Sequence, residues 1–415
     1  MHLIMPFRGL RPAAGQAAAV IAPPYDVLST AEARTRAAGR PFSFLHISKP
    51  EIDLPDGTDP YADSVYAKAA DNLSLLLRGG VLQRDAEPCY YVYRITAGDH
   101  VQTGLVAAAA IPDYDSNRIR KHEFTTVDKE NDRVRQIEAL NAQTGPVLLA
   151  YPDARHIDAL LEEAARGAPD ADALADDGVR HQLWVLRDPA ALSALTRAFD
   201  ALPALFIADG HHRSAAASRI AASRTAAARG LTRLDEDNAN RFLTVIFPHH
   251  ALRILAYNRV VRDLNGLSTD AFLERLGADF AIERLPTGSA PASPRTFHLY
   301  LPGQWYRLTL RPGRVPVDDP VAALDVSLLS DRVLTPLLDI RDLRRDKRIE
   351  FVGGSRGVMA LQERVDDGAM AAAFALFPTR MDDLMAVADA GQVMPPKSTW
   401  FDPKLADGMV SHIID

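Results

Sequence analysis

The amino-acid sequence predicts a mixed α/β (α+β) fold, and two observations carry the prediction. Segments with strand-like alternation and segments with helical periodicity follow one another along the whole chain, as is typical of mixed folds. Near the middle, the apolar run at 205–207 leads through a polar turn into an alanine-rich stretch. A strand, a turn and a helix are therefore expected in succession. The 415 residues suffice for two or three structural units.

The first hundred residues combine short strands with capped helices. A short strand at 20–22 meets two prolines, which stiffen the backbone and hold Tyr25 and Asp26 on a rigid turn. Ser29 or Thr30 is expected to cap the helix that follows. The other elements expected here are a strand at 42–47, a helix at about 59–78 ended by two glycines, and a hairpin of strands at 89–95 and 102–109.

The rest of the chain continues the alternation of helices and strands. The elements expected here are a helix at 129–138, a buried strand at 146–151, helices with one strand (182–186) over about 155–200, a helix from 211 to about 229, a polar loop at 235–240, and strands at 242–247, 296–301, 305–310 and 349–353. No internal repeat interrupts this order.

Composition excludes several classes of protein. The formal net charge of −7 argues against a nucleic acid as partner and against a membrane surface. No apolar run approaches the roughly 20 residues of a membrane span, and the first residues lack the layout of a signal peptide, so we expect a cytoplasmic protein. The single Cys89 excludes an intrachain disulfide and a multi-cysteine zinc site. The sequence does not determine the oligomeric state, and it is compatible with a homo-oligomer.

The polar turn at 209–213 is the densest group of ligand-type residues. It consists of Asp209, Gly210, His211, His212 and Arg213. The glycine allows a ligand to approach the backbone closely, and the free N–H groups of the following helix favour an anion. The arginine side chain favours the same ligand, most simply a phosphate. The alternative is a helix capped by the aspartate, with the two histidines on its surface.

A second polar cluster lies at 120–125. Arg120, Lys121 and His122 place cationic or cation-capable groups beside Glu123. The first two residues suit a phosphate and keep the carboxylate of Glu123 ionised, so that it is available as a base. The alternative is a solvated basic strand end.

A third cluster consists of Lys397, Ser398 and Thr399, which resemble the last residues of a P-loop motif. It lacks the glycine-rich segment of that motif, and the two prolines before it cannot supply N–H groups. The cluster can still offer an ammonium group and two hydroxyls to a phosphate. The alternative is an ordinary C-terminal loop.

Histidines and acids also raise the question of a metal. Adjacent histidines on an extended segment point to opposite faces, so neither His211 with His212 nor His249 with His250 is expected to chelate as a unit. A Mg²⁺ ion that accompanies a nucleotide needs one or two carboxylates. Asp209, Glu123 and Asp26 are the candidates for that role.

The motifs together resemble the DUF1015 family. The matching segments are 22–27 (APPYDV), 121–125 (KHEFT), 208–213 (ADGHHR) and 394–399 (MPPKST), in this order. The chain departs from the family pattern at two places. Ser214 stands where an aromatic residue is usual, and His249 with His250 stands where a His-Arg pair is usual.

A more distant resemblance concerns the 209–213 turn with its alanine-rich helix. It is similar to the signature of the ParB/sulfiredoxin fold, in which a Gly-x-x-Arg turn grips nucleotide phosphates, and one branch of that fold phosphorylates free L-serine. The resemblance implies a ParB/sulfiredoxin-like nucleotide-binding core with insertions at 1–260. A second α/β region would occupy 261–390, and the segment 391–415 would return to the site.

These resemblances and motifs together indicate a small-molecule kinase or phosphotransferase that uses ATP or ADP with Mg²⁺. Its substrate is expected to be a small hydroxylated metabolite, with free L-serine or phosphoserine as the best guess. The alternatives are a non-catalytic nucleotide-binding regulatory module and a metal-dependent hydrolase. The expected roles are phosphate binding by Arg120, Lys121, Gly210, His211, His212, Arg213, Lys397, Ser398 and Thr399, catalysis by Glu123, Asp209 and His122, and substrate binding by Tyr25 and Asp26.

Overall fold

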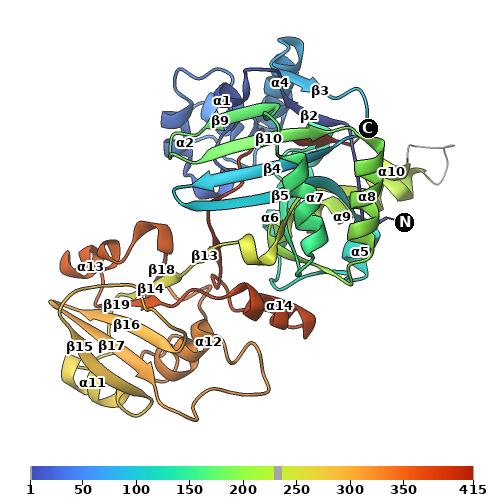
Figure 1. Ribbon diagram of the computed structural model, residues 1–415. Coiled ribbons are helices and arrows are strands. Elements are labelled where there is room, and N and C mark those ends of the chain that lie inside the picture. The colour runs from blue at the N-terminus through green and yellow to red at the C-terminus, as the bar shows by residue number, and fades with distance from the viewer. Residues whose placement is uncertain (1, 229–235, 415) are drawn as a thin grey trace. The chain divides into compact units, whose positions relative to one another are not determined.

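The computed structural model describes residues 2–228 and 236–414 (Figure 1). The chain forms two compact units. Unit 1 comprises Met1–Leu252 with Pro403–Asp415, and unit 2 comprises Arg253–Asp402. Both units contain helices and sheets, which confirms the mixed α/β class. In the described part of the chain, no helix has the length and apolar character needed to cross a membrane.

A nine-stranded mixed sheet organises unit 1. Its strand order is β6-β11-β8-β12-β5-β4-β10-β9, and β1 also pairs with β5; Figure 1 shows β10, β4 and β5 side by side. The strands are β1 (Ile4–Met5), β4 (Tyr90–Ala97), β5 (His100–Ala110), β6 (Ile119–Arg120), β8 (Val147–Tyr151), β9 (Ala171–Leu174), β10 (Arg180–Leu186), β11 (Leu205–Asp209) and β12 (Arg241–Pro248).

Helices bury the apolar side chains of this sheet. Ile157 of α7, Phe199 of α8 and Ala217 of α9 join one core with the strand residues, while Ile137 of α6 packs with Ile220 of α9 in another. The helices that follow the sheet strands are α5 (Ile111–Asp115), α6 (Val127–Leu140), α7 (Arg155–Ala164), α8 (Pro189–Asp200), α9 (His211–Ala228) and α10 (Glu236–Ala239).

The N-terminal residues and the last residues of the chain share a small four-stranded sheet of order β3-β2-β21-β7. Its strands are β2 (Gly9–Pro12), β3 (Leu82–Arg84), β7 (Ala142–Gln143) and β21 (Ser411–Ile413). The helices beside it are α1 (Ala17–Val20), η1 (Tyr25–Val27), α2 (Thr30–Ala37), α3 (Leu45–Ser48), η2 (Pro50–Asp53) and α4 (Asp63–Arg78).

Unit 2 is built on a six-stranded antiparallel sheet of order β15-β17-β16-β19-β14-β18. The strands of this sheet are β14 (Tyr257–Val261), β15 (Phe280–Leu285), β16 (Thr296–Leu301), β17 (Gln304–Leu310), β18 (Ile349–Gly353) and β19 (Ala372–Leu376). A separate two-stranded sheet pairs β13 (Ile254–Leu255) with β20 (Trp400–Phe401). The helices of unit 2 are α11 (Thr269–Leu276), α12 (Asp325–Leu329), η4 (Ser330–Leu334), η5 (Gly354–Arg356), α13 (Met359–Asp366) and α14 (Met381–Asp389).

Four local predictions are wrong. Residues 42–47 lead into helix α3 rather than a strand, because the helical turn buries Phe44, Leu45 and Ile47 together. The segment before the two prolines is helix α1, and only Ala22 makes a β-bridge, to Asp407. Strand β9 adds a second strand between α7 and α8. Residues 236–239 of the expected polar loop form α10, while residue 235 lies outside the described residues.

The sheet register brings three chain segments to one edge. Strand β11 runs parallel to β6, with Phe206 opposite Arg120, and antiparallel to β8, with Asp209 opposite Leu148. The residues that follow β6, those that follow β11 and those that precede β8 therefore meet at the same edge. Both polar clusters predicted for unit 1, at 120–125 and at 209–213, are among them.

Candidate functional site

The 209–213 turn joins the buried strand β11 directly to helix α9. Gly210 has φ +104°, a conformation that side chains disfavour. A Cβ atom added at this glycine would lie 2.9 Å from the Nε atom of Arg213. The glycine therefore allows both the turn and the close approach of the arginine side chain.

We expect the Gly210→Ala variant to lose about 1–3 kcal/mol in free energy of unfolding, because alanine at this φ is strained. The variant should also bind nucleotide more weakly, because the added Cβ atom forces Arg213 to move. Urea unfolding and nucleotide titration measure the two effects. Gly98 in the β4–β5 turn also has positive φ, +57°, but no atom stands within 4 Å of an added Cβ. The control Gly98→Ala should therefore lose stability only. Equal nucleotide affinity of the two variants would contradict this explanation.

Arg213 is a buried cation held from two sides. Its Nη1 atom donates a 2.7 Å hydrogen bond to the carbonyl oxygen of Pro146, and its Nη2 atom lies 3.7 Å from the Asp209 carboxylate. Only 11% of its side chain is exposed. The guanidinium is thus fixed at the sheet edge, beside the N-terminus of α9.

Asp209 carries two cationic partners. Lys404, from the C-terminal segment of unit 1, donates a 3.2 Å hydrogen bond to it, and Arg213 lies on its other oxygen. Burial alone would raise the pKa of Asp209, but the charges of Lys404 and Arg213 outweigh burial and hold the pKa well below its usual range. Asp209 is therefore ionised and neutralised by cations, which suits a positioning role better than proton transfer.

A pair of buried histidines lies beside this carboxylate. The backbone N–H of His122 donates to Nε2 of His211 at 3.3 Å, and the two rings meet edge to face with centroids 4.4 Å apart. Burial lowers the pKa of His122 to about 4 and the pKa of His211 well below its ordinary value. Both rings are therefore neutral at neutral pH, and because Nε2 of His211 accepts, its proton resides on Nδ1.

Glu123 faces that Nδ1 proton. Its carboxylate lies 3.6 Å from Nδ1 of His211, and 46% of the Glu123 side chain is exposed. The arrangement leaves Glu123 able to accept a proton from a group that enters from solvent.

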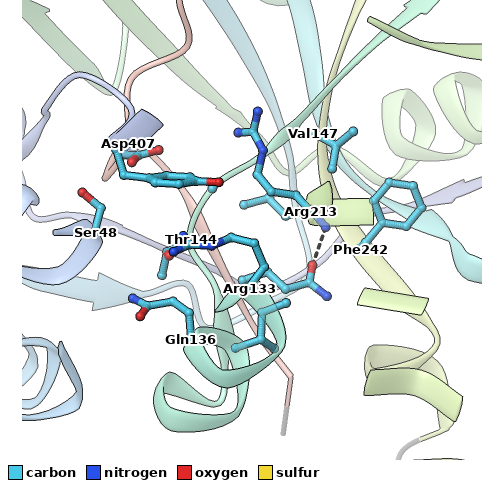
Figure 2. A pocket seen from close by; sticks show the side chains of 13 residues that line it. Ser48, Arg133, Gln136, Thr144, Val147, Arg213, Phe242 and Asp407 are labelled. Atoms are coloured by element: carbon cyan, nitrogen blue, oxygen red, sulfur yellow. Dashed lines mark hydrogen bonds between the residues drawn. The ribbon is translucent and has the colours of Figure 1, made fainter. Parts of the chain in front are cut away.

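Behind the 209–213 turn lies a pocket that belongs entirely to unit 1 (Figure 2). Its space, counted together with the solvent at its open mouth, is about 470 Å³. Figure 2 shows Asp407 and Ser48 on one side, Val147 and Phe242 on the other, with Arg133 and Arg213 between them. The residues that line it are Tyr25, Ser48, Arg133, Gln136, Ile137, Gln143, Thr144, Gly145, Val147, Arg213, Phe242, Leu243 and Asp407.

Opposite charges face one another across this pocket. The guanidinium of Arg133 lies 3.9 Å from the centre of the Tyr25 ring and is paired with Asp132 at 2.6 Å. Asp407 is buried, and burial raises its pKa to about 7 in spite of the nearby Arg213 and Arg133 charges. Two guanidinium groups and an acid that titrates near neutrality can receive a ligand that carries both an anionic and a cationic group.

The pKa of Asp407 predicts a pH effect on stability. Between its ordinary value of 3.8 and its value of about 7 in the folded protein, only the folded state keeps the proton. The free energy of unfolding therefore falls as pH rises, by about 1.4 kcal/mol per pH unit. The Asp407→Asn variant lacks this loss, so its stability relative to the wild type should increase by about 2–3 kcal/mol between pH 5 and pH 7. Urea unfolding without ligand measures it, and a pH-independent difference would contradict it.

The structure brings together most of the site residues predicted in unit 1. His212 accepts a 3.1 Å hydrogen bond from the Thr126 backbone. Lys121 lies 4.0 Å from the centre of the Tyr114 ring, and burial lowers its pKa. Arg120 ends β6, two residues before His122. Tyr25 lines the pocket, whereas Asp26 is exposed.

The third predicted cluster lies in unit 2. The Ser398 hydroxyl donates to the Pro395 carbonyl at 2.7 Å, and the Lys397 ammonium lies 5.3 Å from the centre of the Tyr257 ring. The carbonyl of Lys397 accepts from Arg259 at 2.9 Å. The role of Lys397, Ser398 and Thr399 in binding phosphate stays a prediction.

Sequence reasoning missed three residues of the site: Arg133, Lys404 and Asp407. One signal was available, because the tripeptide Ala-Asp-Gly at 208–210 recurs at 406–408. Gly408 has φ +86°, so the second copy is also a tight turn with an aspartate before the glycine. Lys404 carried no comparable signal, since its partner Asp209 lies 195 positions earlier in the chain.

Comparisons with known proteins identify a family but no close relative. A family described as "Protein of unknown function (DUF1015)" matches residues 4–327. No curated protein matches the chain.

Among solved structures, the chain is similar to a conserved hypothetical protein from Pyrococcus furiosus (15% identity, TM-score 0.35, 73% of this chain and 93% of that one). It is also similar to a free serine kinase in complex with AMP (13%, 0.34, 72% and 86%) and to a C-terminally truncated SbnI from Staphylococcus aureus (11%, 0.36, 73% and 85%). These TM-scores are too low to support conclusions about this chain.

Proposed function

The chain belongs to the DUF1015 family, and we propose that it is a nucleotide-dependent phosphotransferase that acts on a small hydroxylated metabolite, with L-serine as the preferred candidate. The observation that carries the proposal is the position of Glu123. Its accessible carboxylate lies 3.6 Å from the Nδ1 atom of the neutral His211. His211 is the first residue of α9, the helix whose N-terminus would hold the phosphates.

The nucleotide phosphates would bind at the N-terminus of α9. The backbone N–H groups of His211 and His212 have no carbonyl acceptor within the helix, and they favour an anion together with the positive end of the helix dipole. Arg213 and Lys404 add positive charge around Asp209. Phosphoryl transfer depends mainly on such positioning and on neutralised charge.

Glu123 would act as the base. The substrate hydroxyl oxygen forms a bond to the transferred phosphorus, the bond from phosphorus to the nucleotide oxygen breaks, and the hydroxyl proton passes to Glu123. The Nδ1–H group of His211, 3.6 Å from this carboxylate, would orient it. Because both rings of the buried pair are neutral, His122 would support His211 rather than transfer a proton itself.

The acceptor substrate would occupy the pocket between Tyr25, Arg133 and Asp407. The guanidinium group of Arg133 can hold a carboxylate, and Asp407 can hold an ammonium group. An amino acid with a hydroxyl side chain has this set of groups, which is why L-serine is preferred. Mg²⁺ bound to the nucleotide would neutralise phosphate charge.

The proposal is tested by incubating the purified protein with L-serine, Mg²⁺ and ATP or ADP and following the reaction by ³¹P NMR. We expect phosphoserine to accumulate. Ethanolamine, which lacks the carboxylate, should be a much poorer acceptor. No product with any common nucleotide, and none from phosphoserine in reverse, would refute the serine version. Nucleotide binding without turnover would instead support the regulatory module.

A further inference from the structure

Away from this site, two histidines and one aspartate of unit 1 bring three ligand-type atoms together; we name them the Asp153 cluster. Nδ1 of His249 lies 3.7 Å and Nδ1 of His250 lies 3.4 Å from the same carboxylate oxygen of Asp153. All three ligand atoms lie within 4.8 Å of one another. Over residues 2–228 and 236–414, this is the one group of three or more such side chains that converges in this way.

The ends of two parallel strands position the cluster. Tyr151 at the end of β8 is paired with Pro248 at the end of β12, so Asp153 and His249 follow neighbouring strands at one sheet edge. Asp209 is paired near the start of β8, opposite Leu148. The Asp153 cluster therefore lies at the sheet edge opposite the phosphate-binding turn, and its ligand does not depend on the proposed phosphotransferase.

A tight turn aims both histidines at the same carboxylate. The segment His249–Ala251 forms the 3₁₀ turn η3, in which the Leu252 backbone donates to the His249 carbonyl at 3.3 Å. Successive side chains in such a turn are about 120° apart, not on opposite faces as in a strand. The premise that these adjacent histidines lie on an extended segment is therefore wrong.

We propose that the Asp153 cluster binds a divalent transition metal, Zn²⁺. Two imidazoles and one carboxylate suit zinc, whereas Mg²⁺ and Ca²⁺ prefer oxygen ligands alone. Bonds of about 2.0–2.2 Å in a tetrahedron place the ligand atoms roughly 3.4 Å apart, close to the two separations from the Asp153 oxygen, 3.4 and 3.7 Å. The two imidazole nitrogens lie within 4.8 Å of each other.

The exposure of the three side chains would leave a bound ion accessible to solvent, with one coordination position open. His249 is the anchor, with 17% of its side chain exposed, whereas Asp153 and His250 are exposed to 80% and 53%. Three protein ligands leave the fourth tetrahedral position for water, as in catalytic rather than structural zinc sites.

The test is a metal titration of the full chain after treatment with a chelator. Zn²⁺ is titrated in competition with a chromophoric chelator, and Co²⁺ is titrated by its visible absorption, which reports the coordination geometry. We expect one equivalent of either ion to bind, and the His250→Gln and Asp153→Asn variants to lose affinity by about 100-fold or more. His250 and Asp153 are surface residues, so both variants should fold.

A matched control is available at the His2–Asp200 pair, which joins one exposed histidine to one carboxylate and belongs to no group of three such side chains among the described residues. The His2→Gln variant should bind Zn²⁺ like the wild type. Absence of Zn²⁺ binding by the wild type, or equal affinity of wild type and His250→Gln, would overturn the proposal. Neither result would affect the proposed phosphotransferase, whose assay uses other residues and Mg²⁺.

Discussion

The Glu123→Gln variant is expected to lose phosphoryl transfer almost completely while it still binds nucleotide. An amide cannot accept the substrate proton, so kcat should fall by about 10²- to 10⁴-fold, the usual contribution of a general base. The dissociation constant of the nucleotide should change by less than about threefold, since the phosphates are bound by the helix N-terminus and by Arg213. Initial rates and isothermal titration measure the two quantities.

Glu138→Gln is the matched control for that experiment. Glu138 is exposed on α6, and the same substitution there should leave both kcat and nucleotide affinity unchanged. Because Glu123 is about half exposed, its replacement should not unfold unit 1. A wild-type kcat in the Glu123→Gln variant would show that this carboxylate is not the base.

The Arg213→Gln variant should show the opposite pattern. Loss of a charge-assisted hydrogen bond to a phosphate costs about 1.5–3 kcal/mol, so nucleotide affinity should fall by roughly 10- to 100-fold. Arg213→Lys keeps the charge and should recover part of that affinity. Because Arg213 is buried between Pro146 and Asp209, thermal unfolding of both variants is measured alongside binding.

Arg219→Gln is the control on the same helix. Arg219 pairs with Glu130 at 3.3 Å, and 44% of its side chain is exposed, so its replacement should leave nucleotide affinity unchanged. Loss of nucleotide binding in Glu123→Gln but not in Arg213→Gln would show that the two roles are reversed.

Local features of the fold could be predicted where short-range chemistry decides them. Ser29 caps α2 with Glu32 in a capping box, Gly79 ends α4, and Ala97 faces His100 across the hairpin turn. The helix α3 could not be predicted, because a short apolar run satisfies strand and helix patterns equally, and only burial of Phe44 against the rest of unit 1 decides between them.

The two main chain segments of the candidate site could be predicted from the sequence, but some of the residues that complete the site could not. The turns at 120–125 and 209–213 contain dense polar residues, and the register of β6 and β11 brings them together. Lys404 and Asp407 reach the site only because the last residues of the chain return to unit 1. The family resemblance implied that the segment 391–415 returns to the site, but the pairing that places Asp407 there, a β-bridge to Ala22, depends on tertiary structure.

A crystal structure of the protein with ADP, Mg²⁺ and L-serine tests the central proposal most directly. We expect the terminal phosphate within hydrogen-bonding distance of the His211 and His212 backbone N–H groups and of Arg213. The serine hydroxyl should lie within about 3.2 Å of the Glu123 carboxylate, with the serine carboxylate on Arg133. A nucleotide bound elsewhere, or a serine hydroxyl out of reach of Glu123, would contradict the proposed mechanism.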